Sequence, residues 1–139
     1  MYSTRGAVTK RSAIVVSKQF LTGKLHGVSV TRTELDYDGS IAIDIGLLKA
    51  AGIKEYEHIF VYNVTNGERW ETYAILAEED SGIISVNGAG ARKAEVGDNL
   101  IICVYENIPD DWVVMPKLVY VTADNTICRI GNTIPTQTH

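Results

Sequence analysis

Two strand patterns are joined by the segment Leu35-Asp36-Tyr37-Asp38-Gly39-Ser40-Ile41-Ala42-Ile43-Asp44. Before it, residues 28–32 alternate apolar and polar side chains, which is typical of a half-buried strand. After it, a new apolar run begins at Ile41. The Asp-Gly-Ser sequence between them fits an ordinary turn, because glycine adopts backbone angles that other residues avoid.

The Gly39-Ser40 bond also permits a reaction of the backbone. Since Gly39 has no side chain, its carbonyl carbon is open to attack by the Ser40 hydroxyl, which would convert the peptide bond into an ester. Elimination across the Cα–Cβ bond of Ser40 would then cut the chain and leave a dehydroalanine, which hydrolyses to a pyruvoyl group. Taken alone the motif favours a turn, and the segments around it are needed to favour the reaction.

Length, composition and charge limit the class of protein. The chain has 139 residues, 45% of them hydrophobic and 22% charged, which indicates one globular domain with a real core. The net charge of −4 gives no electrostatic case for nucleic acid or an anionic membrane, and no apolar run reaches membrane-spanning length. Cys103 and Cys128 lie far apart and suggest no disulfide framework, so we expect a protein of the reducing cytoplasm.

Both ends of the chain differ from its middle. Residues 1–18 carry four basic side chains and no acid but lack the apolar length of a secretory signal, so we expect a flexible extension with a short edge strand over residues 13–16. Residues 123–139 are polar and are expected to form a loose tail. The folded domain is therefore expected over residues 19–122.

The middle of the chain predicts many short strands and one clear helix. The helix spans residues 45–52, with Asp44 as its cap and Gly52 at its end. Strands over 57–64 and 69–76 form a hairpin, because Asn66-Gly67 between them is a strong turn signal. Further strands are expected over 20–28, 81–86, 99–105 and 116–122. This pattern predicts a small closed β-barrel.

Two strands carry polar side chains that could serve a site. Lys24 and His26 are two apart and share a strand face; they are either two solvated side chains or a cationic wall for an anionic ligand. Alternation places Arg69 and Tyr73 on one face and Thr72 on the other. A twist or bulge near Thr72 would be needed to bring these three to one pocket.

The small residues of Asn87-Gly88-Ala89-Gly90-Ala91 suggest a loop that can approach a ligand closely and offer N–H groups to an anion. A plain loop is the alternative. The sequence has no His-x-x-x-His and no paired cysteines, so we expect no metal site.

Together these segments resemble the pyruvoyl-dependent aspartate 1-decarboxylase family. The motifs that carry the resemblance, in the family's order and spacing over residues 19–122, are Gly23-Lys24-Leu25-His26, residues 35–44, Asn63-Val64-Thr65-Asn66-Gly67-Glu68-Arg69, Thr72-Tyr73-Ala74-Ile75 and residues 83–89. The resemblance implies a mainly β fold, a small six-stranded double-psi β-barrel with a few short helices. It also implies a homotetramer with active sites between neighbouring subunits.

The same resemblance implies an activity and a maturation step. The chain would cut itself between Gly39 and Ser40 into fragments 1–39 and 40–139, and would convert L-aspartate into β-alanine and CO₂ for pantothenate and coenzyme A synthesis. Its covalent cofactor would be a pyruvoyl group derived from Ser40, with no metal and no pyridoxal phosphate. Whether cleavage is spontaneous or needs a maturation helper protein is left open.

Roles for individual residues follow from the resemblance. The ketone made from Ser40 would form a Schiff base with the substrate amine, and Tyr73 would return a proton to the carbanion. Arg69, whose planar fork suits a carboxylate, and Lys24 would hold the substrate. The remaining expected site residues are Thr72 and Gly39 at the cleavage step, Asn87, Gly88 and Ala89 around the substrate, and Tyr37 and His26 just behind the reacting groups.

Two positions depart from the family's pattern. Ile41 stands where the family often has cysteine, and Tyr62 where we would expect tryptophan. Two alternative functions remain at this point: a β-barrel binding or scaffold protein that never matures, and a pyruvoyl enzyme acting on another small acidic amino acid.

Overall fold

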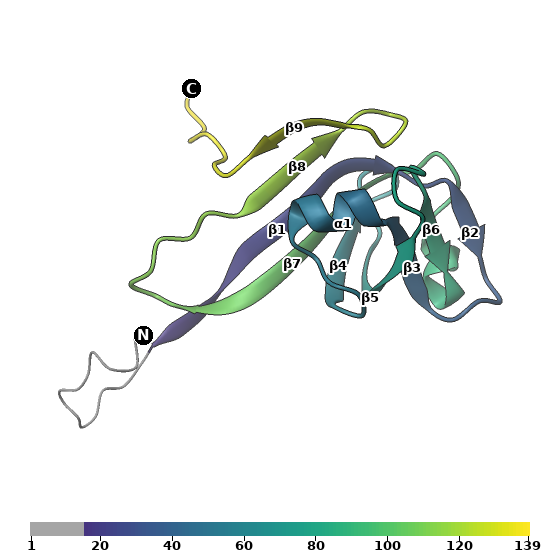
Figure 1. Ribbon diagram of the computed structural model, residues 1–139, viewed down its shortest axis with the longest axis horizontal. Helices are drawn as coiled ribbons and strands as arrows, with labels where there is room; N and C mark the ends of the chain where they lie inside the picture. Colours follow the sequence, from purple (N-terminus) through teal and green to yellow (C-terminus); the bar gives the residue numbers. More distant parts are fainter. Residues whose placement is uncertain (1–15) are drawn as a thin grey trace.

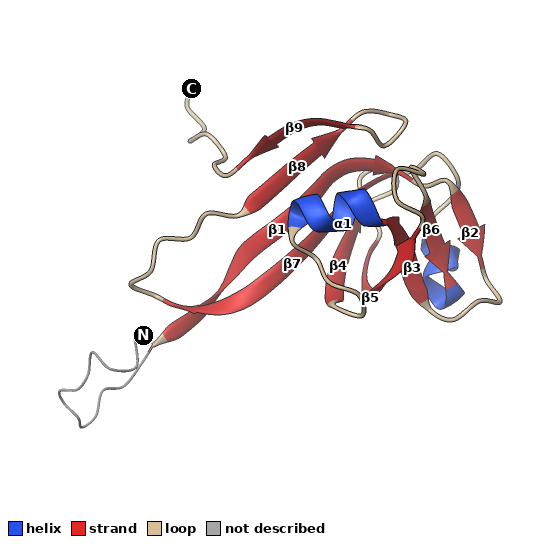
Figure 2. Cartoon of the chain, in the orientation of Figure 1, coloured by secondary structure: helices blue, strands red, loops and turns tan. Residues whose placement is uncertain are grey.

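The computed structural model describes residues 16–139, which form a mainly β chain with two short helices (Figures 1 and 2). In chain order the elements are β1 (Ser17–Ser29), β2 (Arg32–Glu34), β3 (Ser40–Asp44), α1 (Ile45–Ala51), β4 (His58–Asn63), β5 (Arg69–Ala77), β6 (Ile84–Asn87), the 3₁₀ helix η3 (Gly88–Lys93), β7 (Asn99–Pro109), β8 (Lys117–Val121) and β9 (Ile127–Gly131). The predicted mainly β class is confirmed.

The strands are hydrogen-bonded in the order β2-β6-β3-β5-β4-β7-β1-β8-β9. Three neighbouring pairs, β2–β6, β3–β5 and β1–β8, are parallel, and the other pairs are antiparallel. Figure 1 shows β1 and β7 as a long pair, with β8 and β9 along one side and β2, β3 and β6 gathered at the other end. The described residues thus form nine strands, and the six-stranded double-psi barrel stays a prediction.

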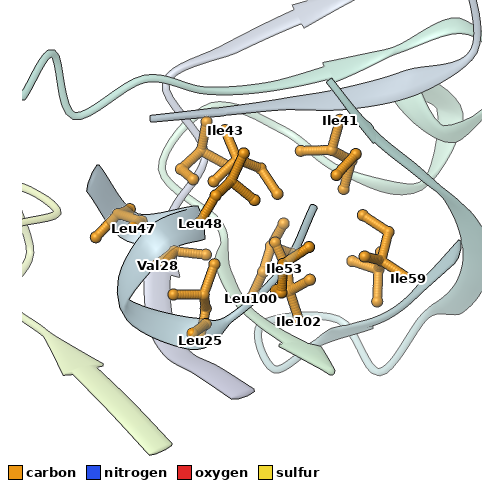
Figure 3. Packing of buried hydrophobic residues seen from close by; sticks show 14 of the residues in the cluster. Leu25, Val28, Ile41, Ile43, Leu47, Leu48, Ile53, Ile59, Leu100 and Ile102 are labelled. Carbon is orange, nitrogen blue, oxygen red and sulfur yellow. The ribbon is translucent and has the colours of Figure 1, made fainter. Parts of the chain in front are cut away.

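One apolar core lies under helix α1 and between the strands (Figure 3). Alternate residues of the long strands point into it, as the period of a pleated strand requires. Its fully buried members include Leu25, Val28, Ile41, Ile43, Ile59, Leu100 and Ile102, and α1 adds Leu47 and Leu48. Each such side chain contributes about 1.5–3 kcal/mol relative to an exposed one.

Helix α1 begins and ends as predicted. The Asp44 carboxylate accepts a hydrogen bond from the backbone N–H of Gly46 at 2.8 Å, and Gly52 ends the helix in the left-handed conformation, with φ at 71°. Asp44 also accepts from the backbone N–H groups of Asp80 and Gly82, each at 2.9 Å. The same carboxylate therefore fixes both the helix start and the turn that leads into β6.

Several predicted boundaries were wrong. Strand β7 continues to Pro109 rather than ending at residue 105, because its far half pairs with the start of β1. That start lies inside the predicted extension 1–18, at Ser17. The expected loop over 87–91 is largely the 3₁₀ helix η3. The expected edge strand over 13–16 falls, except for Val16, outside the described residues.

The prediction of a loose tail over 123–139 was also wrong for its first part. Strand β9 pairs with β8, and the turn before β9 carries the buried Asn125. The Asn125 amide donates to the carbonyls of Ser29 and Gly82 at 2.9 and 2.8 Å and accepts from the N–H of Ser29 at 2.7 Å. Residues 127–130 are all exposed, so this strand lacks the alternation of buried and exposed side chains by which a strand is predicted from sequence.

We expect Asn125→Gly to lower the free energy of unfolding by about 3 kcal/mol, since three hydrogen bonds are lost. Glycine keeps the left-handed backbone of Asn125, whose φ is 64°, so the substitution tests the side chain. Urea unfolding measures the effect. The exposed Asn132→Gly is the control and should change stability by less than about 1 kcal/mol; equal effects would mean that the turn is not anchored.

Candidate active site

Ser40 is the first residue of β3, and the pairing of β3 with β6 places it opposite Asn87. Its side chain is buried, with 1% of the residue exposed. The Asn87 amide donates to Ser40 Oγ at 3.1 Å, and Ser40 Oγ donates to the carbonyl of Asp38 at 2.9 Å. Ser85 Oγ donates to Asn87 Oδ1 at 2.8 Å and so orients the amide. The Ser40 hydroxyl is therefore held in a fixed position away from water.

Gly88 brings the turn before Ser40 into direct contact with the end of β6. A Cβ atom on Gly88 would lie 2.5 Å from Gly39 Cα and 3.3 Å from the carbonyl oxygen of Tyr37, so no side chain fits there. Gly88 also has a φ of 70°, which favours glycine. By contrast, the space where a Cβ of Gly39 would point is open. Gly39, Ser40, Asn87 and Gly88 are thus brought together, and the exposed Ala89 follows in η3.

Tyr73 lies beside Ser40 on the opposite edge of β3. The parallel register pairs Ile41 with Ala74, so the preceding residues, Ser40 and Tyr73, are next in line. The bulge that would be needed near Thr72 for one shared pocket is not present, since the β4–β5 register runs without a shift from Arg69 to Tyr73. The alternation is therefore kept: Tyr73 lies on the exposed face of β5 and Thr72 on the other.

Arg69 lies farther along the same face of β5. At about 3.3 Å per residue, its Cα is about 13 Å from that of Tyr73. Its guanidinium lies 4.3 Å from the centre of the Tyr62 ring. Both residues line a cavity of about 380 Å³, together with Gln19, Phe60, Trp70, Glu71 and Tyr105. Within one chain, Arg69 therefore faces a cavity away from Ser40.

Lys24 and His26 form a separate group around the ring of Tyr120, on β1 and β8. Lys24 Nζ is 5.6 Å and the His26 ring 5.1 Å from the Tyr120 ring centre, and the Arg129 guanidinium lies 3.9 Å from it. Burial, and then the charges of Lys24 and Arg129, lower the pKa of His26 below its ordinary value. His26 Nδ1 is buried without a hydrogen-bond partner. Strands β5, β4 and β7 separate this group from Ser40.

Sequence reasoning missed several residues of these groups. Ser85 has the i, i+2 spacing to Asn87 that places two strand residues on one face, a signal that could have been used. Arg129 lies in the part of the tail that was expected to be loose. Tyr105 and Tyr120 lie on strands that were predicted, but no role was expected for either side chain. Tyr37, which was expected near the site, is 59% exposed.

Residues 16–139 offer no sign of two other kinds of site. No group of three or more His, Cys, Asp or Glu side chains there is arranged to hold a metal ion. No helix in this range has both the length and the apolar character needed to cross a membrane. Cys103 and Cys128 are both free, and burial raises the pKa of Cys103.

Comparisons with known proteins agree with the resemblance. The sequence model of the aspartate decarboxylase family matches residues 16–128. A protein of Methylobacillus flagellatus named aspartate 1-decarboxylase is 56% identical over 124 residues, which cover 88% of this chain and 98% of that protein. Proteins of the same name from Marinomonas sp. and Halorhodospira halophila are 55% and 52% identical, each over 84% of this chain and 94% of their own.

The matched residues contain Ser40, Asn87, Tyr73, Arg69 and Lys24, so the family match and the geometry concern the same part of the chain. The match covers well over half of the sequence, and the relatives are matched over nearly their whole length. From these findings together, this chain belongs to the aspartate decarboxylase family.

Proposed function

We propose that this chain decarboxylates L-aspartate to β-alanine and CO₂, after cutting itself between Gly39 and Ser40. The observation that carries the proposal is the buried Ser40 hydroxyl, held by Asn87 next to the Gly39 backbone that Gly88 contacts. Family membership supports the substrate, since the relatives are named aspartate 1-decarboxylase. The product suits a cytoplasmic enzyme that supplies β-alanine for pantothenate and coenzyme A.

The arrangement around Ser40 suits the cleavage step. The hydroxyl donates to the Asp38 carbonyl, which keeps Oγ beside the backbone of the neighbouring residue. Attack on the Gly39 carbonyl carbon forms the ester C–O bond and breaks the C–N bond, and the hydroxyl proton ends on the released amine. The chain is cut when elimination takes the Cα proton of residue 40 and breaks the Cβ–O bond, which leaves a carboxylate on Gly39 and a dehydroalanine. Hydrolysis of the dehydroalanine takes up one water, releases ammonia and leaves the ketone. Thr72, on the neighbouring strand β5, is proposed to polarise the Gly39 carbonyl.

The residues present fit a pyruvoyl group at position 40. The Asn87 amide is a hydrogen-bond donor oriented by Ser85, and Gly88 leaves room only for backbone on that side. A pyruvoyl group supplies a ketone carbonyl that can accept the electron pair released as CO₂ leaves. We propose that Asn87 and the backbone around Ala89 orient the reacting atoms and that Tyr73, beside position 40, delivers the proton.

We propose that the substrate carboxylates are held by residues of a neighbouring subunit in a homotetramer. Within one chain, Arg69 lies about 13 Å along β5 from Tyr73. Lys24 and His26 lie on β1, three strands beyond β5 in the sheet. Arg69 is exposed, and Lys24 and His26 are half-buried, so all three can face a neighbouring subunit. Pairing these cations with Ser40 of another copy would complete the site.

The cleavage step is tested with Ser40→Ala. Wild-type protein should give fragments 1–39 and 40–139 by intact mass, and its 40–139 fragment should react with phenylhydrazine. Ser40→Ala should stay uncut and release no CO₂ from aspartate, because no hydroxyl remains. The control Ser81→Ala, at an exposed serine, should be cut normally.

Active wild-type protein with an unbroken chain would contradict the proposed cleavage. Faster CO₂ release from glutamate than from aspartate would reassign the substrate. Purified protein that is cut only after adding cell extract would indicate a maturation helper.

Tyr73→Phe should be cut like the wild type yet lose activity. Loss of a positioned proton donor lowers kcat by about 100-fold or more. Stopped assays of β-alanine formation on fully cut protein measure this. A kcat equal to that of the wild type would remove Tyr73 from the role.

A mixed tetramer tests whether each site is shared between subunits. Ser40→Ala and Arg69→Ala chains should each be nearly inactive at low aspartate concentration. Co-expressed, they should recover part of the activity, since an interface between unlike chains can combine an intact Ser40 with an intact Arg69. If co-expression recovers nothing while the mixed tetramers are shown to form, the site lies within one chain.

A further inference from the structure

Arg69 is supported by an aromatic ring rather than by an acid. No salt bridge to Arg69 is found among residues 16–139, although Glu71 lies two positions along the same strand. Glu71 instead contacts His58 Nε2 at 2.8 Å. The guanidinium is 4.3 Å from the centre of the Tyr62 ring, well within the range of a cation–π contact. The arginine is thus left free to bind an anion from the cavity side.

Tyr62 is itself held in place by a second tyrosine. Its hydroxyl forms a hydrogen bond of 2.8 Å with the hydroxyl of Tyr105 on β7. Tyr105 packs edge-on against Phe60, with ring centres 5.0 Å apart. Burial, and then the bond to Tyr62, raises the pKa of Tyr105 above its ordinary value, so the Tyr105 hydroxyl stays protonated at neutral pH. The Tyr62 ring therefore has a fixed position beneath Arg69.

Arg69, Tyr62 and Tyr105 all line the same cavity of about 380 Å³. This volume is at the lower end of small-molecule sites, which suits a small dicarboxylate. The Tyr62–Tyr105 bond is also particular to a tyrosine at position 62. The tryptophan expected there from the family's pattern would offer an N–H donor and no acceptor.

We propose that Tyr105 is a positioning residue for substrate binding, holding Tyr62 so that its ring presents the Arg69 guanidinium to a substrate carboxylate. The inference deepens the proposed function and depends on it. Tyr105 touches no reacting group in this assignment. Its loss should therefore weaken the binding of aspartate without changing the chemical step or the cleavage at Ser40.

The first test is Tyr105→Phe, which removes one hydroxyl and keeps the ring. We expect the KM for aspartate to rise about fivefold, the effect of one lost hydrogen bond, with kcat and the extent of self-cleavage unchanged. Tyr62→Phe removes the other hydroxyl of the pair and should act alike, which keeps the test valid if one variant folds poorly. Thr122→Val is the control, because the Thr122 hydroxyl bonds only within the remote β8–β9 turn, to Asp124 and Thr126.

A double-mutant cycle separates positioning from general packing. In a Tyr62→Phe background the hydroxyl pair is absent, so adding Tyr105→Phe should raise KM no further. Three outcomes would each overturn the inference: an unchanged KM in Tyr105→Phe, a fall in kcat with KM constant, or a full additional effect of Tyr105→Phe in the Tyr62→Phe background. An unchanged KM in Arg69→Ala would instead overturn the substrate-binding part of the proposed function.

Discussion

The pairing of β3 with β6 is the constraint on which the site depends. Ile41 and Ile43 are fully buried, so a slip of one residue would turn both away from the core. The same register places Ser40 opposite Asn87 and, on the other edge of β3, next to Tyr73. Apolar burial thus fixes the relative positions of three polar side chains that have little packing energy of their own.

Behind this pairing, a series of polar contacts joins distant segments. Asp44, at the end of β3, accepts from the N–H of Gly82, and the carbonyl of Gly82 accepts from Asn125. Asn125 bonds in turn to both backbone groups of Ser29 at the end of β1. Each buried polar group in the series has a partner, as burial demands. The β8–β9 turn is therefore part of the folded domain.

The sequence predicted best what depends on neighbouring residues. The limits of α1 followed from Asp44 and Gly52, and the β4–β5 hairpin from Asn66-Gly67, because caps and tight turns are local features. The opposite faces of Arg69 and Thr72 followed from simple alternation, and the β4–β5 register has no bulge that would unite them. The contact of Ser40 with Asn87 joins residues 47 positions apart, and only the resemblance placed them in one site.

The order of strands would have a consequence for a chain broken after Gly39, the cleavage proposed above. The amino-terminal piece carries β1 and β2, which are hydrogen-bonded to β7, β8 and β6 and not to each other. All three partners belong to the carboxy-terminal piece, and β1 also supplies Leu25 and Val28 to the common core. A protein cut there would thus be a two-peptide complex in which each piece completes the other's sheet. Its unfolding would then be a dissociation whose midpoint depends on protein concentration.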